Sequence, residues 1–143
     1  MQIRSPALVV LAVTLAACGS SGGKSSGSGA GSEDSGKQTV AGTSVNFHGT
    51  KDVTGMSSLE IEADNFYFEP TVIKGKPGQR LTLTIKNSSS TEHNFTVKSQ
   101  HVNKDLNGGK TETVTVTLPS SGTISFFCEY HRTSGMAGGL QSS

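Results

Sequence analysis

The stretch Arg80-Leu81-Thr82-Leu83-Thr84-Ile85-Lys86 places an apolar residue at every second position. Successive side chains of a strand point to opposite faces, so this alternation predicts a β-strand with one buried and one exposed face. Residues 59–64 and 113–118 alternate in the same way. The pattern therefore indicates β structure on both sides of the stretch.

Shorter strand signals and turns fill the rest of this region. Further strand segments are expected at 66–73, 95–97 and 123–128. Gly and Pro mark turns at 74–79 and 119–122, because Gly adopts positive φ and Pro presets φ. No helical period interrupts the strands. We expect residues 57–143 to form one all-β domain, an antiparallel β-sandwich of about seven to eight strands.

The N-terminus has the composition of a targeting segment. Residues 7–17 form an apolar run that is too short to span a bilayer as a helix and suits the core of a signal peptide. The run ends in Leu15-Ala16-Ala17-Cys18, which resembles the bacterial lipobox, and lipid on Cys18 would then anchor the mature protein. An ordinary secretory signal that leaves a free Cys18 is the alternative. We expect residues 1–17 to be a signal peptide and the protein to be extracytoplasmic, held at the cell membrane by its lipid.

Residues 18–56 are predicted to be a lipidated N-terminus followed by a flexible linker. Residues 19–36 are almost entirely Gly and Ser, a composition that cannot bury enough apolar surface to fold. Residues 39–55 contain a few apolar side chains without a sustained period. Such a linker would have a reach of roughly 30 Å.

The charge and the cysteine content of the chain limit the classes of function that it can have. The chain has 12 Lys+Arg and 11 Asp+Glu, without the basic cluster that nucleic-acid binding requires. If Cys18 carries lipid, Cys128 is left as a free thiol in an oxidising compartment, and a bound metal would explain it. We expect no nucleic acid and no small-molecule substrate as partners.

Four soft metal ligands lie near the predicted C-terminal strands: His93, Cys128, His131 and Met136. Two imidazoles and a thiolate favour copper or zinc over magnesium or calcium, and the thioether shifts the choice toward copper. Two His, one Cys and a weakly bound Met form the ligand set of a blue-copper electron-transfer centre. Taken singly, Cys128 could be a buried structural thiol and Met136 a core residue. The spacing of all four favours a metal site.

The motifs also resemble those of a known family. The segment from Gly122 to Gly138, with its Cys-x2-His-x4-Met spacing, looks like the C-terminal ligand loop of plastocyanin and pseudoazurin, which are cupredoxins. Glu92-His93-Asn94-Phe95 resembles the segment that carries their first ligand, and residues 66–78 resemble their early strands. The resemblance covers residues 57 to about 140 and implies a Greek-key β-sandwich.

The resemblance implies a role for each residue of the site. His93, Cys128 and His131 would surround one copper ion, and Met136 would be the long axial ligand. Asn94 would brace the site, with its backbone N–H directed toward the Cys128 sulfur.

The resemblance also implies how electrons would reach the site. His131 would present its ring edge to solvent as the electron port. Ala137 and Gly138 would belong to a flat patch around this port, on which partners dock.

The predicted function is a one-electron carrier with a type 1 copper ion cycling between Cu(II) and Cu(I). We expect that the protein is not an enzyme. We also expect that it is a monomer and binds its redox partner proteins transiently. A copper-binding protein that delivers metal to a membrane oxidase would use the same ligands and stays an alternative. A surface β-sandwich module that works without metal is the second alternative.

Overall fold

The computed structural model describes residues 36–143 and contains, within them, twelve strands, two short 3-10 helices and no α-helix. The strands are β1 (Gly36–Val40), β2 (Thr43–Phe47), β3 (Thr50–Asp52), β4 (Ser58–Asp64), β5 (Tyr67–Glu69), β6 (Val72–Gly75), β7 (Arg80–Asn87), β8 (His93–Val97), β9 (Val102–Leu106), β10 (Thr111–Thr117), β11 (Thr123–Phe127) and β12 (Ala137–Ser142). The 3-10 helices are η1 (Lys98–Gln100) and η2 (Arg132–Ser134). In this part of the chain, no helix is long and apolar enough to cross a membrane. The predicted signal peptide, Cys18 and residues 18–35 of the predicted linker lie outside the described residues.

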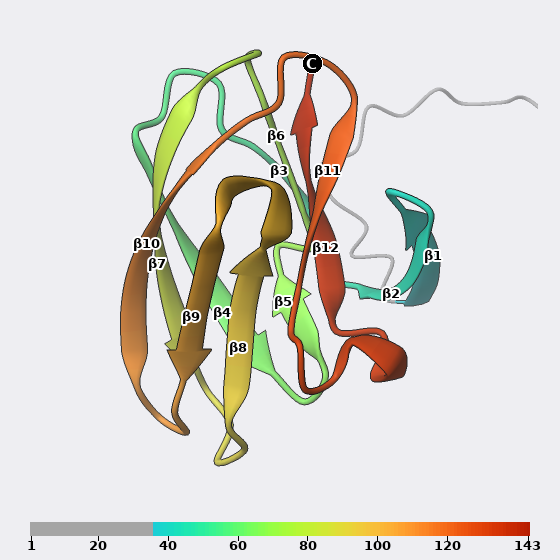
Figure 1. Ribbon diagram of the computed structural model, residues 1–143, viewed down its shortest axis with the longest axis vertical. Coiled ribbons are helices and arrows are strands. Elements are labelled where there is room, and N and C mark those ends of the chain that lie inside the picture. The colour runs from blue at the N-terminus through green and yellow to red at the C-terminus, as the bar shows by residue number, and fades with distance from the viewer. Residues whose placement is uncertain (1–35) are drawn as a thin grey trace, which may run out of the picture.

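Two sheets form a β-sandwich, which confirms the predicted all-β fold class. One sheet has the strand order β10-β7-β4-β5, and the other has the order β3-β6-β12-β11-β8-β9 (Figure 1). The main core lies between them and takes side chains from both, including Ile61, Leu83, Phe68, Phe95, Phe126 and Leu140. The alternating residues Leu81, Leu83 and Ile85 of β7 are all fully buried.

The strand pairing is mixed, whereas the sequence predicted an antiparallel sandwich. β4 runs parallel to β7, and β6 runs parallel to both β3 and β12. A parallel pair needs a crossover connection, and the chain makes one by passing through β6 of the opposite sheet between β5 and β7. The alternating pattern reveals which face of a strand is buried but carries no information about the direction of its neighbour.

The predicted flexible linker is wrong for residues 36–56. β1 and β2 pair as an antiparallel hairpin, and β3 adds to the edge of the six-stranded sheet beside β6. Val53 is fully buried in the main core. The hairpin forms a second apolar cluster with the sheet, made of Val40, Val45, Val72, Phe127 and Ala137.

This second cluster lies on the outer face of the six-stranded sheet. Neighbouring residues of a strand point to opposite faces, and Phe126 belongs to the main core while Phe127 belongs to the second cluster. Figure 1 shows the β1–β2 hairpin beside β12, away from the four-stranded sheet. The sandwich therefore carries a third layer on the side of β12 and the loop that precedes it.

Candidate metal centre

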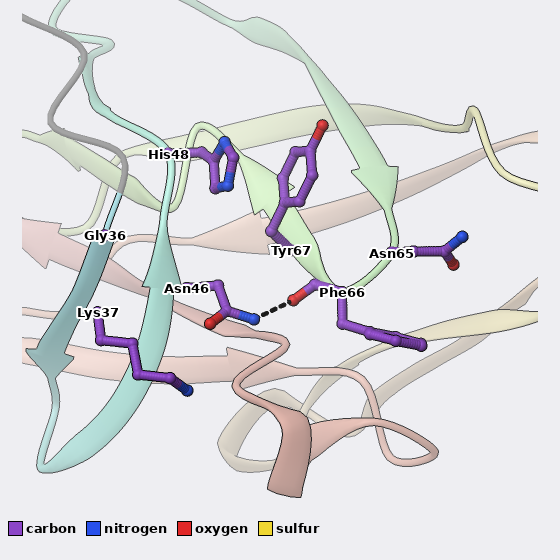
Figure 2. A pocket seen from close by; sticks show the side chains of 7 residues that line it. All are labelled: Gly36, Lys37, Asn46, His48, Asn65, Phe66 and Tyr67. Carbon is purple, nitrogen blue, oxygen red and sulfur yellow. Dashed lines mark hydrogen bonds between the residues drawn. The ribbon is translucent and has the colours of Figure 1, made fainter.

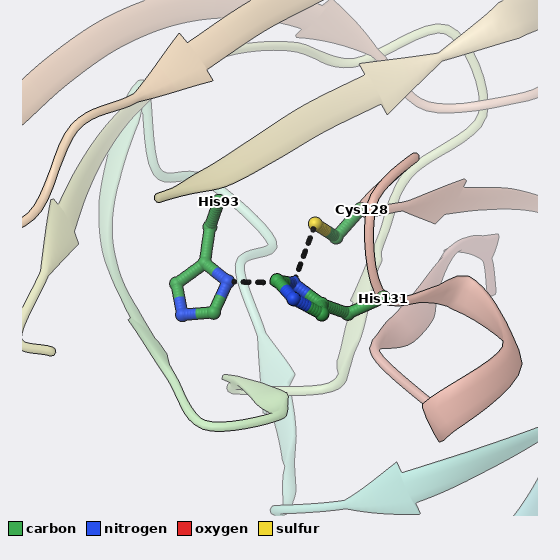
Figure 3. Close-up of side chains that lie close together, drawn as sticks. All are labelled: His93, Cys128 and His131. Carbon is green, nitrogen blue, oxygen red and sulfur yellow. Dashed lines mark hydrogen bonds between the residues drawn. The ribbon is translucent and has the colours of Figure 1, made fainter. Parts of the chain in front are cut away.

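Three of the predicted ligands meet at one end of the sandwich. His93 is the first residue of β8, Cys128 directly follows β11, and His131 immediately precedes η2 (Figure 3). Their nearest ligand atoms all lie within 4.8 Å of one another. The fold thus brings together two segments that are far apart in the sequence.

The distances between the ligand atoms fit a single small ion. Nδ1 of His93 lies 3.2 Å from Nδ1 of His131, and Sγ of Cys128 lies 3.6 Å from the same nitrogen. Nitrogen and sulfur ligands lie about 2.0–2.3 Å from a bound first-row metal, so two of them are separated by roughly 3–4 Å. Both imidazoles present Nδ1 to this point, and a thiolate and two imidazoles suit copper.

Burial differs among the three ligands. His93 and Cys128 are fully buried, whereas His131 is partly exposed. Burial, and to a smaller extent the neighbouring His131, lowers the pKa of His93 below its ordinary value. A neutral imidazole is the form that binds a metal, so burial prepares this ring for binding. His131 is therefore the member of the cluster that reaches the surface, and its role as an electron port stays a prediction.

Met136 belongs to the same buried cluster as Cys128. Its backbone N–H donates to the carbonyl oxygen of His131 at 3.2 Å, and its own carbonyl accepts from the N–H of Cys128 at 3.0 Å. These two bonds close the ligand loop around residues 128–136. The loop turns at Gly135, whose φ of 91° is a left-handed conformation that glycine adopts without strain.

Asn94 is held by its side chain. Its Nδ2 donates to Oδ1 of Asn103 at 2.7 Å and to Oδ1 of Asp105 at 3.0 Å. The hydroxyl of Tyr130 donates to the same oxygen of Asp105 at 2.8 Å. Asp105 therefore joins β8 to the ligand loop, a role that nothing in its local sequence signals. The predicted contact between the Asn94 backbone N–H and the Cys128 sulfur stays a prediction.

The predicted docking patch around His131 is wrong in its residues. Ala137 and Gly138 are buried, because both belong to β12 inside the six-stranded sheet. The ring of Phe66 lies beside His131 instead, with its centroid 4.5 Å from that of His131 and 6.2 Å from that of His93. Phe66 is partly buried, and its ring lies next to both imidazoles.

Asn46 connects the N-terminal hairpin to the ligand loop. Its Nδ2 donates to the carbonyl oxygens of Phe66 and Ser134, each at 2.9 Å, and its backbone N–H donates to Gly135 at 2.9 Å. Figure 2 shows Asn46 and Phe66 at the wall of an open hollow between β2 and residues 65–67. Sequence reasoning missed Asn46 because it lay in the predicted linker.

The fold and the site together define a class of protein: a β-sandwich that carries two histidines and a cysteine at one end. Residues 38–140 match the family model of the cupredoxin-like domain. The chain therefore belongs to the cupredoxin-like family. Its fold and its His-Cys-His cluster fit one type 1 copper ion.

Solved structures share this fold at low sequence identity. The metal-binding domain of the Cu(I)-exporting P-type ATPase CopA from Streptococcus pneumoniae D39, with Cu(I), is 13% identical at a TM-score of 0.54 and covers 65% of this chain and 96% of its own. Reduced auracyanin from Roseiflexus castenholzii is 22% identical at a TM-score of 0.52, and the match covers 61% of this chain and 97% of the auracyanin. A chain of a heme-copper terminal oxidase is 17% identical at a TM-score of 0.52, and the match covers 61% of this chain and 65% of the oxidase chain. At these identities the likeness shows the fold alone.

Proposed function

We propose that this protein is a one-electron carrier whose copper ion is held by His93, Cys128, His131 and Met136. The convergence of two imidazole nitrogens and one thiolate within 4.8 Å carries the proposal. The copper would supply a Cu(II)/Cu(I) couple, and this ligand set is that of blue-copper sites. Loss or gain of one electron then requires no bond chemistry from the protein.

The surrounding residues supply rigidity and access. His93 and Cys128 are anchored at the ends of two strands of one sheet, and the ligand loop is closed by backbone hydrogen bonds. Phe66 places an apolar ring beside both histidines. The partly exposed ring of His131 is the route by which an electron would leave or enter.

The cellular setting is part of the same proposal. Lipid on Cys18 would hold the domain outside the cytoplasm, at the membrane, where it meets redox proteins transiently as a monomer. The lipobox-like sequence supports this placement. A terminal oxidase among the structures of similar fold is compatible with a membrane-bound partner.

A second candidate is copper binding for delivery to another protein. The similarity to a metal-binding domain of a Cu(I)-exporting ATPase favours it. Full burial of His93 and Cys128 favours retention of the ion over rapid release, so the carrier stays the first choice. A reversible reduction potential with slow copper loss supports the carrier, and fast transfer of copper to a competing chelator supports delivery.

The first experiment is a titration of the purified chain with Cu(II), followed by visible absorption and EPR. We expect an intense thiolate-to-copper charge-transfer band and narrow copper hyperfine splitting. Cys128→Ser removes the sulfur ligand and should abolish the band while the far-UV spectrum of the β-sandwich is retained. Cys18→Ser is the matched control and should leave the band unchanged. A blue Cys128→Ser variant would contradict the assignment.

A further inference from the structure

The segment between β7 and β8 contains a chain of hydrogen bonds that ends on His93. The chain begins at the fully buried Asn87, whose Nδ2 donates to the carbonyl oxygens of Thr91 at 2.7 Å and Leu106 at 2.8 Å. A carbonyl oxygen can only accept. The nitrogen of the Asn87 amide must therefore face these two oxygens, and this requirement fixes the orientation of the amide.

The oxygen of the Asn87 amide must then accept from Ser89. It lies 3.0 Å from the backbone N–H and 2.9 Å from the hydroxyl of Ser89. The carbonyl oxygen of Thr91, 3.2 Å away, is a second acceptor for the same hydroxyl proton. A hydroxyl has one proton to donate, and the Asn87 oxygen is the nearest acceptor for that of Ser89.

With its proton directed to Asn87, the Ser89 oxygen presents its lone pairs to His93. The Thr91 N–H donates to Oγ of Ser89 at 3.1 Å, and Nε2 of His93 lies 3.0 Å from the same oxygen. An oxygen that has already donated its proton can only accept from the ring. In this arrangement the proton of the neutral imidazole lies on Nε2, which leaves Nδ1 with a free lone pair.

We infer that Ser89, oriented by Asn87, is a positioning residue that holds His93 in the tautomer able to bind metal through Nδ1. Nδ1 is the atom that faces His131 at 3.2 Å within the ligand cluster (Figure 3). Partners of the second ring nitrogen commonly fix the tautomer and orientation of a histidine ligand. The inference rests on the proposed metal site, although the tautomer is a property of the metal-free protein.

Three consecutive serines provide a matched set of variants. Ser89 is buried, whereas Ser88 and Ser90 are exposed and their hydroxyls make no hydrogen bond within the described residues. Ser89→Ala removes the acceptor of Nε2–H. The proton then moves to Nδ1, where the ring nitrogen of His131 lies within hydrogen-bonding distance. Ser88→Ala and Ser90→Ala should change nothing, and Ser89→Thr should preserve the hydroxyl.

The test measures the ring ¹⁵N shifts of His93 in the metal-free full chain by NMR and the Cu(II) affinity by competition. We expect an Nε2–H ring in the unaltered protein, in Ser88→Ala, in Ser90→Ala and in Ser89→Thr. In Ser89→Ala we expect a shift toward Nδ1–H and a copper affinity lower by about 10–100-fold. If Ser89→Ala does not fold, Ser89→Gly replaces it with the same expectations.

Two results would overturn the inference. One is an Nδ1–H ring in the unaltered protein. The other is an unchanged tautomer and unchanged affinity in the variant that lacks the hydroxyl. Failure of the unaltered protein to form a blue copper complex would instead overturn the proposed function, because the NMR measurement needs no copper.

Discussion

Asp105 accepts hydrogen bonds from two residues that come from different segments, Asn94 and Tyr130. The bond from Tyr130 stabilises the neutral phenol, and the negative charge of Asp105 disfavours the phenolate, so the pKa of Tyr130 rises to about 12. The folded pKa exceeds the unfolded value. The bond therefore contributes stability fully below pH of about 10, and the contribution is lost as pH rises toward 12.

This shift can be measured because the chain has two tyrosines and no tryptophan. In a Tyr67→Phe background, phenolate absorbance reports Tyr130 alone, and we expect its titration near pH 12. Adding Asp105→Asn removes the charge and should return the pKa toward its ordinary value of about 10. A Tyr130 that titrates near 10 with Asp105 intact would show that the hydrogen bond does not form in solution.

The residues of the metal centre differ in how far the sequence could predict them. The closeness of Cys128 and His131 was predictable because their spacing lies within one loop, whereas Met136 as a ligand stays a prediction. Ser89 and Asp105 were not, because each acts through partners that only the folded chain brings near. The chain has many serines and aspartates in polar segments, and most such residues are exposed. Nothing in the local sequence separates Ser89 or Asp105 from the others.

At the scale of elements, the β1–β2 hairpin shows why a strand pair was missed. Val40 pairs with Thr43, so Ala41 and Gly42 form a two-residue turn, and both have positive φ, at 47° and 76°. Such turns favour Asn-Gly, and Ala-Gly gives a weak turn signal. The strands are short, and only one face of the hairpin meets the sheet, so no long alternating pattern appears.

The same turn predicts a stabilising substitution. Ala41 is exposed and adopts a left-handed conformation that its side chain disfavours. Ala41→Asn fits this conformation better and should raise the free energy of unfolding by about 1 kcal/mol, measured by urea denaturation. Ala41→Val is the opposite control and should lower it, because a branched side chain fits worse. An Asn variant less stable than the parent would exclude a turn of this type.

Strand β12 is packed tightly on both faces, and its two central glycines make this possible. A Cβ on Gly138 would overlap the carbonyl oxygen of Thr71 and the ring of Phe126 in the core, and one on Gly139 would lie 2.7 Å from Val40 of the hairpin. β12 leads directly out of the ligand loop. Its close packing therefore fixes the C-terminal end of that loop.

Gly138→Ala should accordingly destabilise the protein. Overpacking of a core typically costs about 1–3 kcal/mol, and overlap with a backbone oxygen places this site at the upper end. Gly36→Ala is the matched control, since its Cβ would meet nothing within 4 Å, and its effect should stay within about 0.5 kcal/mol. Equal urea midpoints for the two variants would contradict the packing described here.

The whole molecule depends on residues 36–56 in two ways. These residues add buried valines to both apolar clusters, namely Val40, Val45 and Val53. They also supply Asn46, which binds the ligand loop through Ser134 and Gly135. The domain predicted to begin at residue 57 lacks both contributions, so the N-terminal boundary affects the stability of the fold and of the site.

Comparison of fragments 36–143 and 57–143 tests this dependence. Each buried valine contributes about 1.5–3 kcal/mol, so their loss removes much of a net stability that is about 5–15 kcal/mol for a typical domain. We expect 36–143 to unfold cooperatively, and 57–143 to be unfolded or to melt far lower by circular dichroism. Asn46→Ala within 36–143 separates the two contributions, because it keeps the valines and should weaken copper binding more than folding. Equal melting temperatures for both fragments would mean that the hairpin, β3 and Val53 are dispensable for the sandwich.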